Sequence, residues 1–453
     1  MNYGKYTKGN YNFIDIKEKK IFISNNIIKS KNLNILKEKN NKMSNENTVD
    51  SNNGSKVRKY SNESAKLKNN ENQNIFKENK DINSECINNL ASEKNTFDIN
   101  NENNSNINKP NIVILKNVGN TTYMSSVIRC LTDNSDFYDY YLKNKDIIKN
   151  NADKMPISYA FSRIIAHLYP SINGPFENSY SLDKFYKVII FLNPAFKGKS
   201  TKNAIDFLIY FIEKIHQEGK QMQKLLKNID NSKQIEIDYN NYDKYFKYLR
   251  EFEYSNILDE FYWINQSVNK CWNCNEEKKT FNSFFTYDLD FENALGKTIL
   301  EHKKELTIFD CIKYTLKSKT LYNVFCENCD EMSNIEKNSS IKLCEKSLIF
   351  LVRRNEETKN INNLKNNEII FRIDEKLDLS DLIGIEKSVY TLKGLISYNI
   401  EELEYTAYSV NPNNKQWYKY NKEKIIPIKI YDFINGNSSK ILPEILFYRK
   451  LLK

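Results

Sequence analysis

The segment ILKNVGNTTYMSSVIRCL, at residues 114–131, contains three local signals in succession. A short apolar run is followed by a glycine turn and then by residues with helical spacing. A threonine hydroxyl can accept a hydrogen bond from a free backbone N–H in the first helical turn, so we expect Thr122 to cap this helix. Val127, Ile128 and Leu131 give the helix an apolar stripe. The segment therefore predicts a short apolar stretch followed by a helix with one buried face.

The composition of the chain changes near residue 110. Residues 1–110 contain 29 Asn, and their 19 basic and 13 acidic residues give a net charge of +6, out of +10 for all 453 residues. A segment this polar, without a lasting apolar period, cannot bury enough apolar surface to offset the entropy of ordering it. We therefore predict a disordered, low-complexity tail over residues 1–109 and one folded domain over residues 110–453.

Composition also restricts the compartment and the partners. No run of about 18 apolar residues occurs, which predicts no membrane span. The N-terminus lacks the apolar core of a secretion signal, and four of the eight cysteines stand in CxxC pairs. Together these features indicate a reducing, intracellular location, cytoplasmic or nuclear. Acidic and basic residues are interspersed, so the net charge favours a protein partner over nucleic acid.

Helical signals precede strand signals along the chain. Residues 158–170 and 201–219 have the apolar spacing of helices, with expected ends at Pro170 and near Gly219. After residue 280 the pattern changes to short β-rich runs such as SLIFLVRR and EILFYRK. Helices followed by strands predict an α+β domain rather than alternating βαβ units.

Two cysteine pairs predict a metal site. Cys271 and Cys274 form CWNC, Cys326 and Cys329 form CENC, and 51 residues separate the two pairs. Two thiolates three residues apart can bind one ion on a tight turn, and two such turns complete a tetrahedral site of four sulfurs. Zinc is the ion that this soft ligand set favours, with a redox CxxC or chance spacing as alternatives. The long separation predicts that the turns lie at strand ends in a larger insertion.

These features occur in the order that one enzyme family shows. LKNVGNTTYMSSVIRCL resembles a box in which a cysteine follows a Gly-Asn-Thr turn, and KNAIDFL resembles a helix that the family writes Gln-Asp-Ala-x-Glu-Phe-Leu. CWNC and CENC are similar to its zinc-bearing fingers, and YTLKGLISYNIEELEYTAYSV and LPEILFYRK are similar to its histidine box and closing strand. Over about residues 112–451 the chain thus resembles the ubiquitin-specific proteases. The resemblance implies a papain-like fold of thumb, palm and fingers, with the fingers at about residues 260–335.

The same resemblance assigns the catalytic positions to residues of the wrong chemistry. Thr122 stands at the nucleophile position, Glu404 at that of the histidine and Lys422 at that of the acid that orients the histidine. Only Asn117, at the position of the oxyanion-stabilising amide, is retained. An aliphatic alcohol is far less acidic than a thiol, whose pKa is about 8.5, and an ordinary carboxylate is a weak base for it.

No histidine is placed to supply the missing base. The chain has three, His167, His216 and His302, and none lies after residue 302, where the base is needed. Structural alternatives to catalysis are a helix cap for Thr122, a paired strand residue for Glu404 and a solvated charge for Lys422. We therefore expect a catalytically inactive deubiquitinase-like protein that binds ubiquitin, a ubiquitin-like protein or another protein. An active deubiquitinase, and a scaffold subunit that does not bind ubiquitin, are the alternatives.

Overall fold

The computed structural model describes residues 112–169, 178–198, 202–227, 237–354, 370–384, 387–399, 402–422, 424–434 and 442–451. The predicted tail at residues 1–109 lies outside these ranges, so its disorder stays a prediction. No helix in the described part of the chain is both long and apolar enough to cross a membrane.

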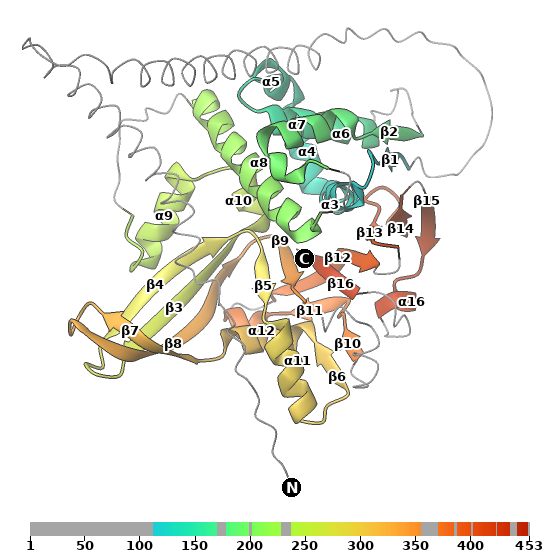
Figure 1. Ribbon diagram of the computed structural model, residues 1–453. Coiled ribbons are helices and arrows are strands. Elements are labelled where there is room, and N and C mark those ends of the chain that lie inside the picture. Colours follow the sequence, from blue (N-terminus) through green and yellow to red (C-terminus); the bar gives the residue numbers. More distant parts are fainter. Residues whose placement is uncertain are drawn as a thin grey trace, which may run out of the picture. The chain divides into compact units, whose positions relative to one another are not determined.

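Helices dominate the first half of the described chain and form a unit that we call the thumb (Figure 1). The thumb comprises α3 (Thr122–Thr132), α4 (Ser135–Lys143), α5 (Lys145–Asn150), α6 (Pro156–Leu168), α7 (Asp183–Leu192), the 3-10 helix Pro194–Phe196, α8 (Ala204–Lys227), α9 (Tyr242–Phe252) and α10 (Asn256–Phe261). Two short strands, β1 (Ile114–Lys116) and β2 (Ser179–Ser181), pair in parallel beside it.

Helix α8 continues past its predicted end near Gly219. Its last residue is Lys227, so Gly219 lies inside the helix, where a glycine costs about 1 kcal/mol relative to alanine. The glycine allows a close approach instead, because a Cβ at this position would lie 3.0 Å from the Cβ of Ser255. Gly219 is therefore a packing residue and not a helix terminator.

An eight-stranded sheet forms the palm. Its order is β15–β14–β13–β12–β16–β9–β5, with β11 paired to β12 outside this path. The strands are β5 (Tyr287–Leu289), β9 (Ser347–Val352), β11 (Lys376–Asp378), β12 (Val389–Asn399), β13 (Glu404–Val410), β14 (Trp417–Asn421), β15 (Lys424–Ile428) and β16 (Leu442–Lys450). Two short helices, α15 (Ser380–Ile383) and α16 (Tyr431–Ile434), lie between palm strands in the sequence.

The palm is buried on both faces. In β9, Ile349 and Leu351 belong to the core shared with the thumb, whereas Leu348 and Phe350 belong to a second core on the opposite face. Successive side chains of a strand point to opposite faces, so a strand covered on both sides is apolar throughout. This explains why SLIFLV reads as a continuous apolar run and why all six residues are buried. The α+β class predicted from the sequence is confirmed.

A second sheet forms the fingers, with the strand order β4–β3–β8–β7 (Figure 1). Its strands are β3 (Trp263–Cys271), β4 (Glu277–Phe284), β7 (Lys319–Cys326) and β8 (Glu331–Cys344). The segment between β4 and β7 returns to the palm through β5, α11 (Phe291–Leu300), β6 (Glu305–Thr307) and α12 (Ile308–Leu316), and β6 pairs with β10 (Ile370–Arg372). The four strands of the fingers extend to residue 344, beyond the expected interval of about 260–335. The segment between β4 and β7 belongs to the palm, so the fingers are not continuous in the sequence.

Candidate functional site

Thr122 is the first residue of α3 and lies at a contact between thumb and palm. Its side chain does not cap the helix, contrary to the sequence-based expectation. Thr121 is the N-cap residue and makes no side-chain cap bond. The Oγ1 of Thr122 instead accepts a hydrogen bond of 3.2 Å from the backbone N–H of Tyr405 in β13. Thr122 is only 3% exposed, so this bond joins thumb to palm across a buried contact.

Glu404 and Lys422 form an ion pair next to this contact. The Nζ of Lys422 lies 2.8 Å from Oε1 of Glu404. Strands β13 and β14 are antiparallel with Ala407 opposite Tyr420, a register that puts Glu404 and Lys422 at the same end of the hairpin. The hydrogen bond to Glu404 raises the pKa of Lys422 above its usual value. The structure therefore brings the residues at all three expected catalytic positions to one place.

Buried polar atoms without a hydrogen-bond partner among the described residues lie at or next to the expected catalytic positions. They include Nδ2 of Asn117, Oε2 of Glu404 and Oδ1 of Asn421, the residue before Lys422. The Oδ1 of Asn117 makes only a long hydrogen bond, since it accepts from the hydroxyl of Thr121 at 3.5 Å.

The histidines are engaged on other elements. Nδ1 of His167 lies 2.7 Å from the carbonyl oxygen of Arg163 in α6, and Nδ1 of His216 lies 2.7 Å from Oγ of Ser255 beside α8. His302 follows α11, in a left-handed turn with φ of 54°. All three histidines thus lie on elements other than those that carry Thr122, Glu404 and Lys422.

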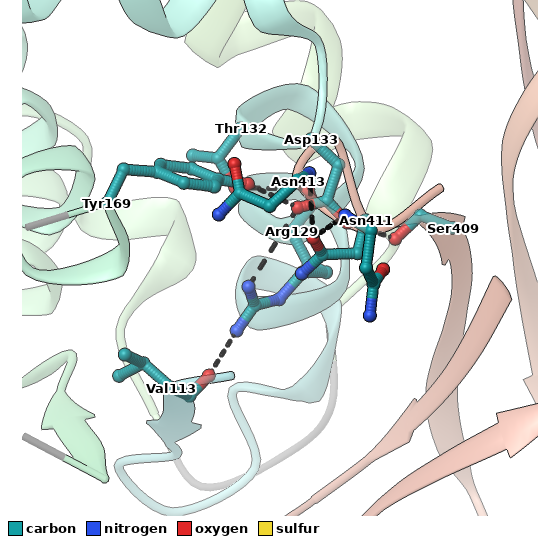
Figure 2. A network of polar contacts seen from close by, with 9 residues as sticks. Val113, Arg129, Thr132, Asp133, Tyr169, Ser409, Asn411 and Asn413 are labelled. Carbon is teal, nitrogen blue, oxygen red and sulfur yellow. Dashed lines mark hydrogen bonds and ion pairs between the residues drawn. The ribbon is translucent and has the colours of Figure 1, made fainter. Parts of the chain in front are cut away.

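A buried charged network fixes α3 on the palm behind this site (Figure 2). Arg129 donates to the carbonyl oxygen of Val113, and its guanidinium lies 3.9 Å from the carboxylate of Asp133. Asp133 also accepts hydrogen bonds from the hydroxyls of Tyr169, at 2.6 Å, and Ser409. Burial raises the pKa of Asp133, and the nearby Arg129 opposes that rise. The network connects α3 to β13 and to the residue that follows α6.

Sequence analysis missed this network although one signal was present. Arg129 and Asp133 are four residues apart, the spacing of an ion pair on a helix. Such pairs usually lie on solvated faces, and only the packed structure shows these side chains to be 4% and 3% exposed.

The four paired cysteines converge at the tip of the fingers. All four Sγ atoms lie within 4.8 Å of one another, with 3.9 Å between Cys271 and Cys329 and 3.8 Å between Cys274 and Cys326. A tetrahedron with metal–sulfur bonds of about 2.3 Å has edges of about 3.8 Å. A disulfide needs sulfurs about 2.05 Å apart. The arrangement therefore fits one metal ion such as zinc and does not fit two disulfides.

The two cysteine turns have the same backbone construction. The N–H of Asn275 donates to the carbonyl of Cys271, and the N–H of Asp330 donates to that of Cys326, both at 2.9 Å. Asn275 and Asp330 have φ of 60° and 57°, in the left-handed region that Asn and Asp tolerate. Strands β3 and β7 end at Cys271 and Cys326, so the predicted position of the turns at strand ends is confirmed.

The thiols are electrostatically inequivalent without a cation. Backbone N–H hydrogen bonds, first from Cys274, and the Ser333 hydroxyl lower the pKa of Cys271 to about 6. The pKa of Cys329 is raised, because its thiol is desolvated and lies next to the sulfurs of the other three cysteines. Neighbouring thiolates repel one another, and a divalent cation removes that repulsion.

Comparisons with known proteins place these features in a family. The profile of the family described as "Ubiquitin carboxyl-terminal hydrolase" matches residues 113–448. Ubiquitin carboxyl-terminal hydrolase 2 of Bos taurus is 24% identical over 325 residues, covering 69% of this chain and 52% of that protein. Ubiquitin carboxyl-terminal hydrolase 4 of Saccharomyces cerevisiae is 22% identical over 377 residues, covering 74% of this chain and 39% of that protein. The chain thus spans about half or less of these relatives' lengths.

Solved structures show the same fold. A chain of the SAGA Ubp8/Sgf11/Sus1/Sgf73 DUB module bound to ubiquitin aldehyde matches with a TM-score of 0.54 at 20% identity. The match covers 76% of this chain and 70% of that chain. A structure of the yeast SAGA DUB module matches with a TM-score of 0.53, covering 76% and 69%.

Proposed function

The chain belongs to the ubiquitin carboxyl-terminal hydrolase family, and from that membership we propose that it is a catalytically inactive member that binds ubiquitin or a ubiquitin-like protein. The observation that carries the proposal is the ion pair between Glu404 and Lys422, which lies where a base and its orienting acid are expected. An ordinary carboxylate is a weak base for an alcohol, and the ammonium group of Lys422 already engages one oxygen of this carboxylate.

The hydroxyl of Thr122 is also poorly placed for nucleophilic attack. Its oxygen already accepts the N–H of Tyr405, which withdraws electron density from the atom that would attack. No imidazole stands within reach to take its proton, and an alcohol needs a positioned base more than a thiol does. Loss of catalytic groups that act as a unit costs several powers of ten in rate.

Binding is supported by the unpartnered amide of Asn117. A buried donor without an acceptor costs about 1–3 kcal/mol. Its Nδ2 has no partner among the described residues, so a carbonyl oxygen of a bound partner would satisfy it. A binding function therefore gives a reason for keeping this side chain when the reactive groups are replaced.

We also propose that the fingers hold one structural zinc ion through Cys271, Cys274, Cys326 and Cys329. Four sulfur ligands leave no open position for a substrate, which is typical of structural and not catalytic zinc. The ion would join the turn after β3 to the turn after β7, which are distant in the sequence.

Catalysis is tested with a fluorogenic substrate released from the C-terminus of ubiquitin. The full chain and the variant Thr122→Cys should both show turnover at the background rate. The triple variant Thr122→Cys, Glu404→His, Lys422→Asp should exceed them by at least about tenfold, since it restores nucleophile, base and orienting acid together. Turnover by the unmodified chain that Thr122→Ala abolishes would instead establish the active alternative.

Binding is tested separately by titrating labelled ubiquitin onto the full chain. Saturable binding without turnover supports the proposal. The pair Asn117→Ala and Asn117→Asp provides the specific readout, because both variants remove the amide donor and should weaken binding several-fold. Asn203→Ala, which removes an amide at the start of α8, is the control. No binding by a folded chain would favour the scaffold alternative.

A further inference from the structure

A separate cavity opens at the opposite end of α3 from Thr122. Its volume is about 170 Å³, and it is lined by the C-terminal part of α3, the end of α10, four palm strands and the turn between β13 and β14. The apolar part of its wall is formed by Phe261, Leu348 and Phe447. The cavity shares no lining residue with the replaced catalytic positions.

Three cationic side chains from separate elements line this cavity. Lys393 comes from an irregularity in β12, where the register with β16 shifts between Leu392 and Gly394. Lys415 comes from the turn between β13 and β14, and Arg449 comes from β16. Within the described residues, the ammonium group of neither lysine has an ion-pair or hydrogen-bond partner.

The positive charges of Lys415 and Arg449 affect the pKa of Lys393. Burial lowers the pKa of Lys393, and Lys415 and Arg449 lower it further, whereas Glu375 opposes the change weakly. Mutual repulsion of cations beside a cavity is relieved when an anion enters it.

The nearby acids do not neutralise the lysines. Both oxygens of Asp133 accept hydrogen bonds, from Tyr169 and from Ser409. Oε1 of Glu260 accepts from Asn134 and from Ser347, two residues that line the cavity. Glu260 also lies 4.0 Å from Arg449, which donates to Oδ1 of Asn134, and Asp133 lies 3.9 Å from Arg129. The cations that these carboxylates pair with are therefore the two arginines and not the two lysines.

We propose that this cavity binds a single phosphate group, held by Lys393, Lys415 and Arg449. The cavity volume admits one tetrahedral oxyanion with a few waters, since a water occupies roughly 30 Å³ of the liquid. The phosphate group can come from free inorganic phosphate or from a phosphorylated serine in a partner protein. In both cases the oxygens accept hydrogen bonds from the ammonium groups and relieve their repulsion.

The test is calorimetric titration of the full chain with two probes, inorganic phosphate and a short phosphoserine peptide, at low ionic strength. Saturable binding of at least one probe is expected. Lys393→Gln and Lys415→Gln should each weaken it about tenfold or more, and Lys393→Arg should restore most of the loss. Tighter binding of the peptide identifies a modified partner as the source, and equal or tighter binding of phosphate identifies the free anion.

Lys376→Gln is the matched control. Lys376 is an exposed lysine on β11, which pairs with β12, and its side chain does not line the cavity. This variant should change binding less than about twofold, and unchanged thermal unfolding should show that all variants are folded. Absence of saturable binding of both probes, or an equal loss in Lys376→Gln, would overturn the proposal.

Discussion

The tip of the fingers and the thumb–palm contact at Thr122 each bring together residues that are distant in the sequence, but with different chemistry. In the fingers, four sulfurs from two turns lie at the spacing of one tetrahedral metal site. At the thumb–palm contact, Thr122, Glu404 and Lys422 also lie together, yet they form a backbone hydrogen bond and an ion pair. A metal site stabilises the fold whatever the protein does, whereas catalytic side chains contribute to turnover and little to folding. Replacing the second set therefore leaves the fold intact.

The largest effect is expected from breaking the sulfur cluster. Cys271→Ser should abolish metal binding and unfold the fingers, because structural zinc contributes about 10–16 kcal/mol of apparent binding energy in small zinc domains. Native mass spectrometry measures the metal and thermal unfolding measures the stability. Cys311→Ala, which removes a buried thiol in the palm core, should keep one equivalent of metal. Retained metal and stability in Cys271→Ser would show that the cluster is not a metal site.

The next effect concerns the network that fixes α3 on the palm. Arg129→Met should lower the free energy of unfolding by about 3–5 kcal/mol, because Asp133 is left buried without its cation. The variant also removes the guanidinium that lies 4.5 Å from the ring centroid of Tyr420. The loss should shrink in acid, where protonation of Asp133 removes the uncompensated charge. Denaturant titrations measure both effects.

Lys187→Met is the control for the Arg129 experiment. Lys187 forms an exposed ion pair with Asp183 on α7, and such pairs contribute about 0–1 kcal/mol. Equal losses in the two variants would mean that the buried network has no special role in holding thumb and palm together.

A smaller effect is expected at Thr122 itself. Thr122→Val keeps the shape of the side chain but leaves the N–H of Tyr405 without its acceptor, which should cost about 1–3 kcal/mol. Thr122→Ser keeps the acceptor and should cost less. Chemical denaturation measures the free energy of unfolding of both variants. A stability ranking with valine above serine would remove the structural role that we assign to this hydroxyl.

The smallest effect lies within the thumb, between α8 and the end of α9. Glu253, which follows α9, contacts Lys220 and His216 of α8. Burial alone would raise the pKa of Glu253, but hydrogen bonds from His216 and Lys220 lower it from 4.5 to about 2. A lowered pKa in the folded state means that this group stabilises the protein above about pH 4.5 and loses that contribution as the pH falls toward about 2.

The variant Glu253→Gln should therefore lose less of its melting temperature than the unmodified chain when the pH falls from about 5 to about 2. Glu251→Gln, at an exposed position of the same helix, is the matched control. An unchanged acid limb in Glu253→Gln would assign the acid sensitivity to other groups.

Several features could be predicted because they depend on short-range sequence. CxxC places two sulfurs on one turn, and two identical turns need a common ion, so the cluster followed from spacing and ligand chemistry. The continuous apolar run in β9 and the later β-rich segments indicated the palm. The expected end of α8 at Gly219 was wrong, since helix propensity gave way to close packing against Ser255. The prediction that Thr122 caps α3 was wrong, because Thr121 is the N-cap residue and the hydroxyl of Thr122 accepts from the N–H of Tyr405.

The amino-acid sequence alone predicted the α+β class, the family resemblance and the clustering of four cysteines, and it alone carries the prediction that the catalytic residue types are missing. Only the folded chain showed that Glu404 and Lys422 pair, that Thr122 bonds to a strand 283 positions away, and that the charges of Arg129 and Asp133 are buried. The physical reason is the range of the interactions. Residue types and short spacings determine which chemistry a chain can carry, whereas strand register and packing determine which distant groups meet and which lose their water.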